Sequence, residues 1–260
     1  MWQLQHLTEH LLTFTLVLVR VSGLFVTAPI FGTSDVPARV RAFLAFALAV
    51  LVAPMQWKTP VANPGNMVNM LVLVGNELLI GAVLGLGIML LLSGVQIAGQ
   101  VIGQMSGMQL ADVFSPGLDT SMPIFSHLLF QLALVVFVIL GGHRMMMEAL
   151  LDSFTAMPPG TAGFSRTLTE TLTTLLAQSF SLGVRAAAPA MAALLLATLV
   201  LGLISRTLPQ LNIMALGFGL NSFVTLGVLS VSLGAVAWLF SEQVAPVIEM
   251  LTESLKIAPA

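Results

Sequence analysis

Long apolar stretches alternate along the chain with short segments rich in glycine, proline and polar residues. The apolar stretches run over residues 11–31, 40–53, 67–110, 124–151, 168–204 and 213–247. The segments between them are turn-forming, because helices disfavour proline and glycine in their interiors. The apolar stretches are too long for strands and lack strict alternation of apolar and polar positions. The pattern therefore predicts an all-α fold of six apolar helical elements arranged as hairpins.

Composition places these helices in a membrane. The chain has 260 residues and is 57% hydrophobic and 8% charged, whereas soluble domains carry about 25% charged residues. About 20 residues suffice to cross the hydrocarbon of a bilayer. The last two stretches would each reach roughly 50 Å as continuous helices. They therefore extend beyond the hydrocarbon or cross it at a steep tilt, and the sequence leaves both possibilities open.

Several functional classes find no support in the sequence. The net charge is −2 and the nine basic residues are scattered, so the basic patch of a nucleic-acid-binding protein is absent. The chain has no cysteine, its four histidines lie mostly at segment ends, and the one pair with helical spacing, His6 and His10, lacks a third ligand, so we expect no metal site. The motifs of serine hydrolases, zinc proteases and nucleotide-binding loops are also missing. We therefore expect neither catalytic activity nor a cofactor.

Among the charged residues within the apolar stretches, we single out those in the middle of apolar runs, namely Arg20, Glu77 and Arg185. An unpaired ion in apolar surroundings is costly. We therefore expect these residues to be buried charges that pair within the chain or with another subunit. The alternative is that their charged ends reach water or a wet cavity.

Small and polar residues form two stripes in the third apolar stretch. Pairs of glycines spaced four residues apart let helix backbones approach closely. They are Gly81, Gly85, Gly99 and Gly103. Three amides that need hydrogen-bond partners in apolar surroundings form the second stripe. They are Gln96, Gln100 and Gln104. These amides line a pore or face another subunit, or they belong to ordinary packing within the chain.

Four segments carry motifs that are highly specific when taken together. They are residues 20–54, which read RVSGLFVTAPIFGTSDVPARVRAFLAFALAVLVAP, residues 76–125, residues 141–154, which read GGHRMMMEALLDSF, and residues 205–221, which read SRTLPQLNIMALGFGLN. This combination covers most of the chain and resembles the FliR family, subunits of the bacterial flagellar type III export gate.

The resemblance implies an inner-membrane subunit of the flagellar basal body that assembles with FliP and FliQ, next to FlhB and FlhA. This hetero-oligomer would carry unfolded flagellar export substrates and stand largely above the bilayer plane. Residues 1–165 resemble FliP in fold, and residues 166–260 resemble the long helical hairpin of FliQ. Injectisome homologues share this architecture and are the alternative. A small-solute transporter is a further alternative, but the chain shows no internal repeat typical of that class.

In the family, the loop after the glycine-rich helix plugs the export channel, and it corresponds to residues 106–122. Methionine and phenylalanine side chains suit a closure that excludes water yet yields to a passing chain. Glycines keep the backbone of such a closure adaptable. The residues assigned to the plug are Met105, Gly107, Met108, Leu110, Phe114, Pro116, Gly117, Leu118 and Met122.

The turn between the last two apolar stretches is polar. It contains Arg206, Pro209, Gln210 and Asn212. We expect the outer surface of this hairpin to bind neighbouring FliQ-like hairpins, and the turn itself to contact another export protein. The alternative is a turn that is simply solvated.

Overall fold

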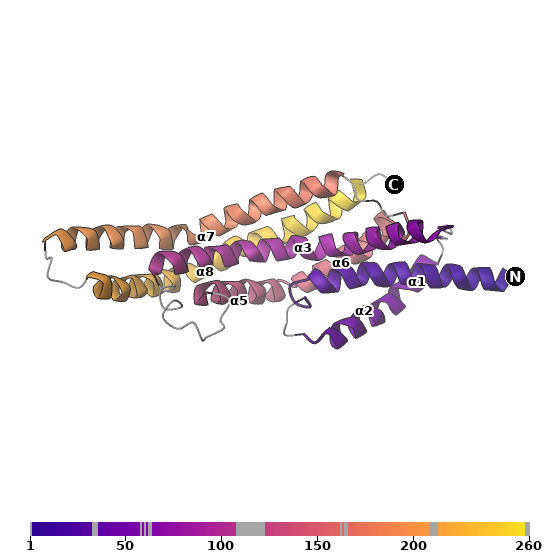
Figure 1. Ribbon diagram of the computed structural model, residues 1–260, viewed down its shortest axis with the longest axis horizontal. Coiled ribbons are helices and arrows are strands. Elements are labelled where there is room, and N and C mark those ends of the chain that lie inside the picture. Colours follow the sequence, from indigo (N-terminus) through magenta and orange to yellow (C-terminus); the bar gives the residue numbers. More distant parts are fainter. Residues whose placement is uncertain are drawn as a thin grey trace. The chain divides into compact units, whose positions relative to one another are not determined.

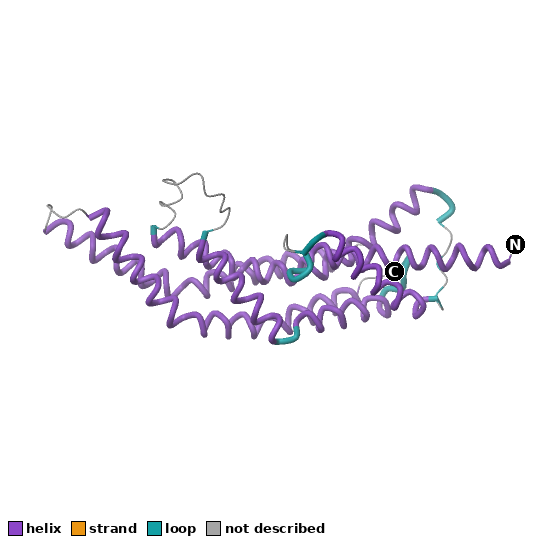
Figure 2. Tube along the Cα trace, turned by 90° about the horizontal axis from the view of Figure 1, so that it is seen from below, coloured by secondary structure: helices purple, strands orange, loops and turns teal. Residues whose placement is uncertain are grey.

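The fold consists of helices in the part of the chain that the structure describes (Figure 1). This computed structural model describes residues 2–32, 36–57, 59, 61, 64–107, 123–161, 163, 166–207 and 213–257. The elements are α1 (Trp2–Thr27), α2 (Ala38–Val52), the short 3-10 helix η1 (Ala53–Gln56), α3 (Met67–Ser106), α5 (Ile124–Ile139), α6 (Gly142–Ala156), α7 (Arg166–Thr207) and α8 (Ile213–Ile257). Figure 2 shows no strand among the described residues, which confirms the all-α fold class.

Helix boundaries fall where proline, asparagine and glycine interrupt the apolar pattern. Pro37 directly precedes α2. At the start of α3, Oδ1 of Asn66 accepts a hydrogen bond from the backbone N–H of Asn69 at 2.8 Å and so caps the helix. At the end of α3, Gly107 has a φ of 77°, the left-handed conformation that often follows a helix.

The stretch over residues 124–151 forms two helices and not the single element that its apolar pattern predicts. α5 and α6 are separated by a bend of 66°. Gly141 lies at this bend with a φ of 72°, which residues with a side chain rarely adopt. Counted as one bent element, the pair is the sixth of the six apolar elements that the pattern predicts, and the consecutive glycines Gly141 and Gly142 lie at its bend.

The helices are those of a membrane protein. Five described helices are long and apolar enough to cross a membrane, and the bent pair α5 and α6 is a sixth candidate if it forms one span. α3, α7 and α8 contain 40, 42 and 45 residues. At about 1.5 Å per residue each is roughly 60 to 68 Å long, about twice the thickness of the hydrocarbon.

The chain divides into two compact units. The first contains Met1–Leu90, Val138–Leu176 and Val244–Ala260. It therefore holds α1, α2, α6, the first part of α3, the start of α7 and the end of α8. Burying each large apolar side chain in such a core stabilises it by about 1.5–3 kcal/mol. Core side chains of this unit include Leu16, Leu24, Ile80, Leu150 and Leu251.

The second unit contains Leu91–Phe137 and Ala177–Gln243. Here α7 and α8 form an antiparallel hairpin. Leu182 and Leu239 line one cleft between them, and Leu201 packs beside Gly217 nearer the turn. Core side chains of this unit include Leu92, Ile102, Leu129, Phe137 and Phe240. The domain boundary between residues 165 and 166 stays a prediction.

Candidate functional site

α1 and α3 cross in the first unit with almost no space between their backbones. A Cβ on Gly81 would collide with the carbonyl oxygen of Arg20, and one on Gly85 would collide with the hydroxyl of Thr27. From the other side, a Cβ on Gly23 would lie 2.5 Å from a carbonyl oxygen of α3. The glycine spacing in α3 thus serves a backbone contact with α1.

Replacing Gly81 with alanine is expected to destabilise the chain by about 1–3 kcal/mol, because the added methyl group overpacks the crossing. Gly75 on the same helix is the matched control, since a Cβ there meets no atom within 4 Å. Gly75→Ala should be neutral or stabilising by up to about 1 kcal/mol through helix propensity. Thermal unfolding of the purified variants measures the difference. Equal unfolding temperatures would contradict the packing role of Gly81.

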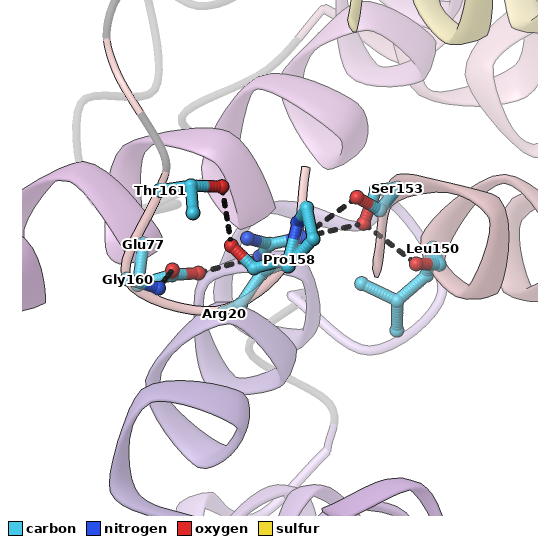
Figure 3. A network of polar contacts seen from close by, with 7 residues as sticks. All are labelled: Arg20, Glu77, Leu150, Ser153, Pro158, Gly160 and Thr161. Atoms are coloured by element: carbon cyan, nitrogen blue, oxygen red, sulfur yellow. Dashed lines mark hydrogen bonds and ion pairs between the residues drawn. The ribbon is translucent and has the colours of Figure 1, made fainter. Parts of the chain in front are cut away.

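A buried ion pair lies at this crossing (Figure 3). Nε of Arg20 donates a hydrogen bond to Oε2 of Glu77 at 2.6 Å, and both side chains are fully buried. Nη1 of Arg20 donates to the carbonyl oxygen of Ser153 at 2.9 Å and to its hydroxyl at 3.2 Å. The guanidinium carbon lies 4.4 Å from the centre of the Phe154 ring, a cation–π arrangement. The structure thus brings two of the three isolated charges together and joins α1, α3 and α6.

The carboxylate of Glu77 also holds the segment that follows α6. Its Oε1 accepts a hydrogen bond from the backbone N–H of Gly160 at 2.9 Å (Figure 3). Gly160 has a φ of 84°, and a Cβ there would lie 2.7 Å from Val61, so this position requires glycine. Both oxygens of Glu77 are therefore used. Nη2 of Arg20, in contrast, is buried without a hydrogen-bond partner among the described residues.

Arg185 is not buried within this chain, so its expected pairing with another subunit stays a prediction. It is exposed on α7 and has no hydrogen-bond or ion-pair partner within the described chain. It lines a cleft of about 120 Å³ in the second unit, together with the polar side chains of Gln178, Ser181 and Gln243. Arg20 is buried because several elements cover it, whereas other elements cover little of the apolar part of α7.

The C-terminal part of α3 is packed just as closely in the second unit. A Cβ on Gly99 would lie 2.5 Å from a carbonyl oxygen at the start of α5. Where α3 meets α7, a Cβ on Gly183 would lie 2.6 Å from the carbonyl oxygen of Gly94. Gly103 departs from the expectation of close approach, because a Cβ there would meet Pro123 at an ordinary 3.6 Å.

The stripe of amides lies on the same part of α3. Gln96 and Gln100 are half-buried, and Gln104 is exposed. The hydroxyl of Ser126 donates a hydrogen bond to the backbone carbonyl of Gln96 at 3.2 Å, which links α5 to α3. A role of these amides in lining a pore or contacting another subunit stays a prediction.

Most of the loop and turn residues singled out in the sequence lie outside the described residues. Met105 is half-buried near the end of α3, Gly107 follows that helix, and Arg206 is exposed near the end of α7. The plug-loop residues outside the described part are Met108, Leu110, Phe114, Pro116, Gly117, Leu118 and Met122. The turn residues outside it are Pro209, Gln210 and Asn212. Their roles stay predictions.

Sequence reasoning missed several residues that complete the ion-pair network. Ser153 and Phe154 follow the apolar stretch that ends at residue 151, and nothing in the sequence around them indicates a contact with Arg20. Gly160 follows two prolines, which predicts a turn but not the partner of its N–H. Within the described ranges, no group of three or more histidine, aspartate or glutamate side chains is placed to hold a metal ion.

Comparison with known proteins identifies the family. The family described as "Bacterial export proteins, family 1" matches residues 11–247. The flagellar biosynthetic protein FliR of Aquifex aeolicus is 33% identical over 225 residues, which cover 86% of each chain. The FliR proteins of Bacillus subtilis and Escherichia coli are each 31% identical, over 86% of this chain and 86% and 87% of their own. The chain therefore belongs to the FliR family of bacterial export proteins.

Proposed function

We propose that this chain is a subunit of the flagellar protein export gate and forms, with FliP and FliQ, the channel through which unfolded flagellar proteins cross the inner membrane. Membership of an export family supports a role in transport and not in catalysis. The relatives named above are flagellar biosynthetic proteins, which favours the flagellar gate over an injectisome. In this proposal FlhB and FlhA are neighbours of the gate in the basal body.

The observation that carries the proposal is the apolar surface that the long helices leave uncovered. α7 and α8 are about 63 and 68 Å long, more than the hydrocarbon of a bilayer spans. Large apolar side chains are exposed along both helices, from Leu176 and Phe180 on α7 to Phe223 and Trp238 on α8. Any part of this surface outside the hydrocarbon needs protein to cover it. Neighbouring helical hairpins of FliP and FliQ would supply that cover.

The loop over residues 106–122 is the plug in this proposal. A channel wide enough for an unfolded chain needs a closure that blocks ions when no substrate passes. The backbone contact at Gly99 holds α3 against the start of α5, so the two helices that flank the loop form a firm stem. A loop with methionine and phenylalanine side chains on such a stem can open while the helices keep their packing.

Site-specific photocrosslinking in cells tests this assembly. A photoreactive residue at Phe180, which is 51% exposed, is expected to form adducts with FliP or FliQ. One at Gln210, in the hairpin turn, is expected to form an adduct with another export protein such as FlhB. Glu170, near the start of α7, is the control and should give little adduct. Its side chain is exposed and ion-paired with Arg166.

The possible outcomes separate the subunit role from the turn contact. A tagged chain that forms no adduct at Phe180 and recovers neither FliP nor FliQ would overturn the proposed function. A missing adduct at Gln210 alone would show that the turn is solvated, and the subunit role would stand.

A further inference from the structure

α7 divides at Arg185 into a charged part and an uncharged part. Between Arg185 and Arg206 lie roughly 20 residues without a charged side chain, the length that crosses the hydrocarbon of a bilayer. The part before Arg185 begins with Arg166, Glu170 and several threonines. We infer that residues 186–205 lie at the level of the hydrocarbon and that the guanidinium of Arg185 binds phospholipid phosphate groups at its edge. This inference concerns the membrane contact and does not depend on the proposed channel.

The uncharged part of α7 presents apolar side chains outward. Leu195, Leu199 and Leu203 are 53%, 57% and 69% exposed. The hydroxyl of Thr198, also on the surface, donates a hydrogen bond to the carbonyl oxygen of Leu194 in its own helix at 2.8 Å. Such internal bonding lets a hydroxyl lie in surroundings without water. This surface of α7 therefore meets the requirements of contact with lipid.

α8 also passes from an uncharged part to a charged part beside Arg185. Its residues 213–241 carry no charge, and Glu242 is the first charged residue of the helix. Gln243, next to it, lines the same cleft as Arg185, so the boundaries of the uncharged parts of the two helices coincide. Trp238 is 59% exposed close to this boundary, a position that tryptophan favours at membrane interfaces. Two antiparallel helices thus mark one edge of the hydrocarbon.

The cleft around Arg185 suits a phosphate group. The guanidinium has no partner within the described chain, and Glu242 forms no ion pair with it. The amides of Gln178 and Gln243 and the hydroxyl of Ser181 place further hydrogen-bond donors around the cleft. A carboxylate of a neighbouring subunit would also satisfy the cation. The coinciding edges of α7 and α8 and the exposed apolar surface between them favour lipid.

Photocrosslinking of the assembled complex tests the contact with lipid. A photoreactive residue at Leu199 is expected to form adducts with phospholipid acyl chains, detected by mass spectrometry. Their yield should be several-fold higher than at Phe180, which lies before Arg185 on the same helix. Protein adducts that outnumber lipid adducts at Leu199 would overturn the inference, because a neighbouring subunit would then cover this surface.

Phospholipid bound to the purified complex tests the role of Arg185. Arg185→Gln is expected to lose at least one bound phospholipid per chain, and Arg185→Lys to retain it. Arg166→Gln is the control, because Arg166 is exposed on the same helix but pairs with Glu170 at 2.8 Å. Unchanged lipid with lower recovery of FliP or FliQ in Arg185→Gln would overturn the inference and indicate a carboxylate partner.

Two further measurements cover loss of the Arg185 variants and loss of the partner subunits. If the Arg185 variants fail to accumulate, the comparison of Leu199 with Phe180 decides, since it leaves Arg185 in place. Recovery of FliP and FliQ is measured in the same preparations. Lipid adducts at Leu199 without these partners would support the lipid contact and contradict the proposed function.

Discussion

Arg20→Ala is expected to destabilise the chain by about 3–5 kcal/mol and to lower the yield of assembled complex before any step of transport is affected. The substitution leaves the carboxylate of Glu77 buried, with the backbone N–H of Gly160 as its remaining donor. It also removes the donor to the carbonyl oxygen of Ser153 and opens a cavity beside Phe154. The measurements are the recovery of the chain in the complex and the thermal unfolding of that complex.

Two further variants distinguish the effect of leaving a buried charge unpaired from the effect of losing an ion pair in general. Arg144 pairs with Glu148 at 3.0 Å on the surface of α6, with both side chains exposed. Arg144→Ala should therefore cost at most about 1 kcal/mol. Arg20→Met combined with Glu77→Gln removes both buried charges and keeps an acceptor for the N–H of Gly160. This double variant should recover part of the yield. Normal yield from Arg20→Ala would show that the buried pair does not support the fold.

The fold class and most helix positions follow from the sequence because hydropathy and turn-forming residues act locally. α3 and α7 begin and end within a few residues of positions where apolar stretches meet glycine, proline or polar residues. α8 begins at the predicted residue 213 but ends at Ile257, beyond the predicted end at residue 247. The break between α5 and α6 does not follow, because the apolar stretch continues on both sides of it. A single backbone conformation, the positive φ of Gly141, decides that break.

The partners of the isolated charges depend on tertiary contacts that no local pattern contains. Arg20 and Glu77 are 57 residues apart in the sequence. They meet because Gly23 and Gly81 let α1 and α3 approach closely. Arg185 interrupts its apolar stretch in the same way and is nevertheless exposed. An apolar pattern is the same for a helix buried in protein and for one facing lipid, so it does not distinguish these two environments.

Deleting residues 107–119 is expected to leave the helices and the complex intact. The last turn of α3 and the first residue before α5 are already close, because a Cβ on Gly103 would lie 3.6 Å from Pro123. The three residues that remain, 120–122, span up to about 10 Å when extended. The contact between Gly99 and the start of α5 involves none of the deleted residues and keeps its packing. We therefore expect the packing of α3 against α5 to survive the deletion.

The same deletion is expected to make the membrane leak ions or small solutes while export of unfolded substrates survives in part. Apolar side chains close a passage by excluding water and reopen without leaving an ion unpaired. Met108→Ala combined with Phe114→Ala, which keeps the loop length, should therefore give a milder leak. The measurement is the ion or solute permeability of cells that make the complex, with complex yield determined in parallel. A deletion variant that assembles fully and keeps the membrane tight would show that this loop is an ordinary connection and not a plug.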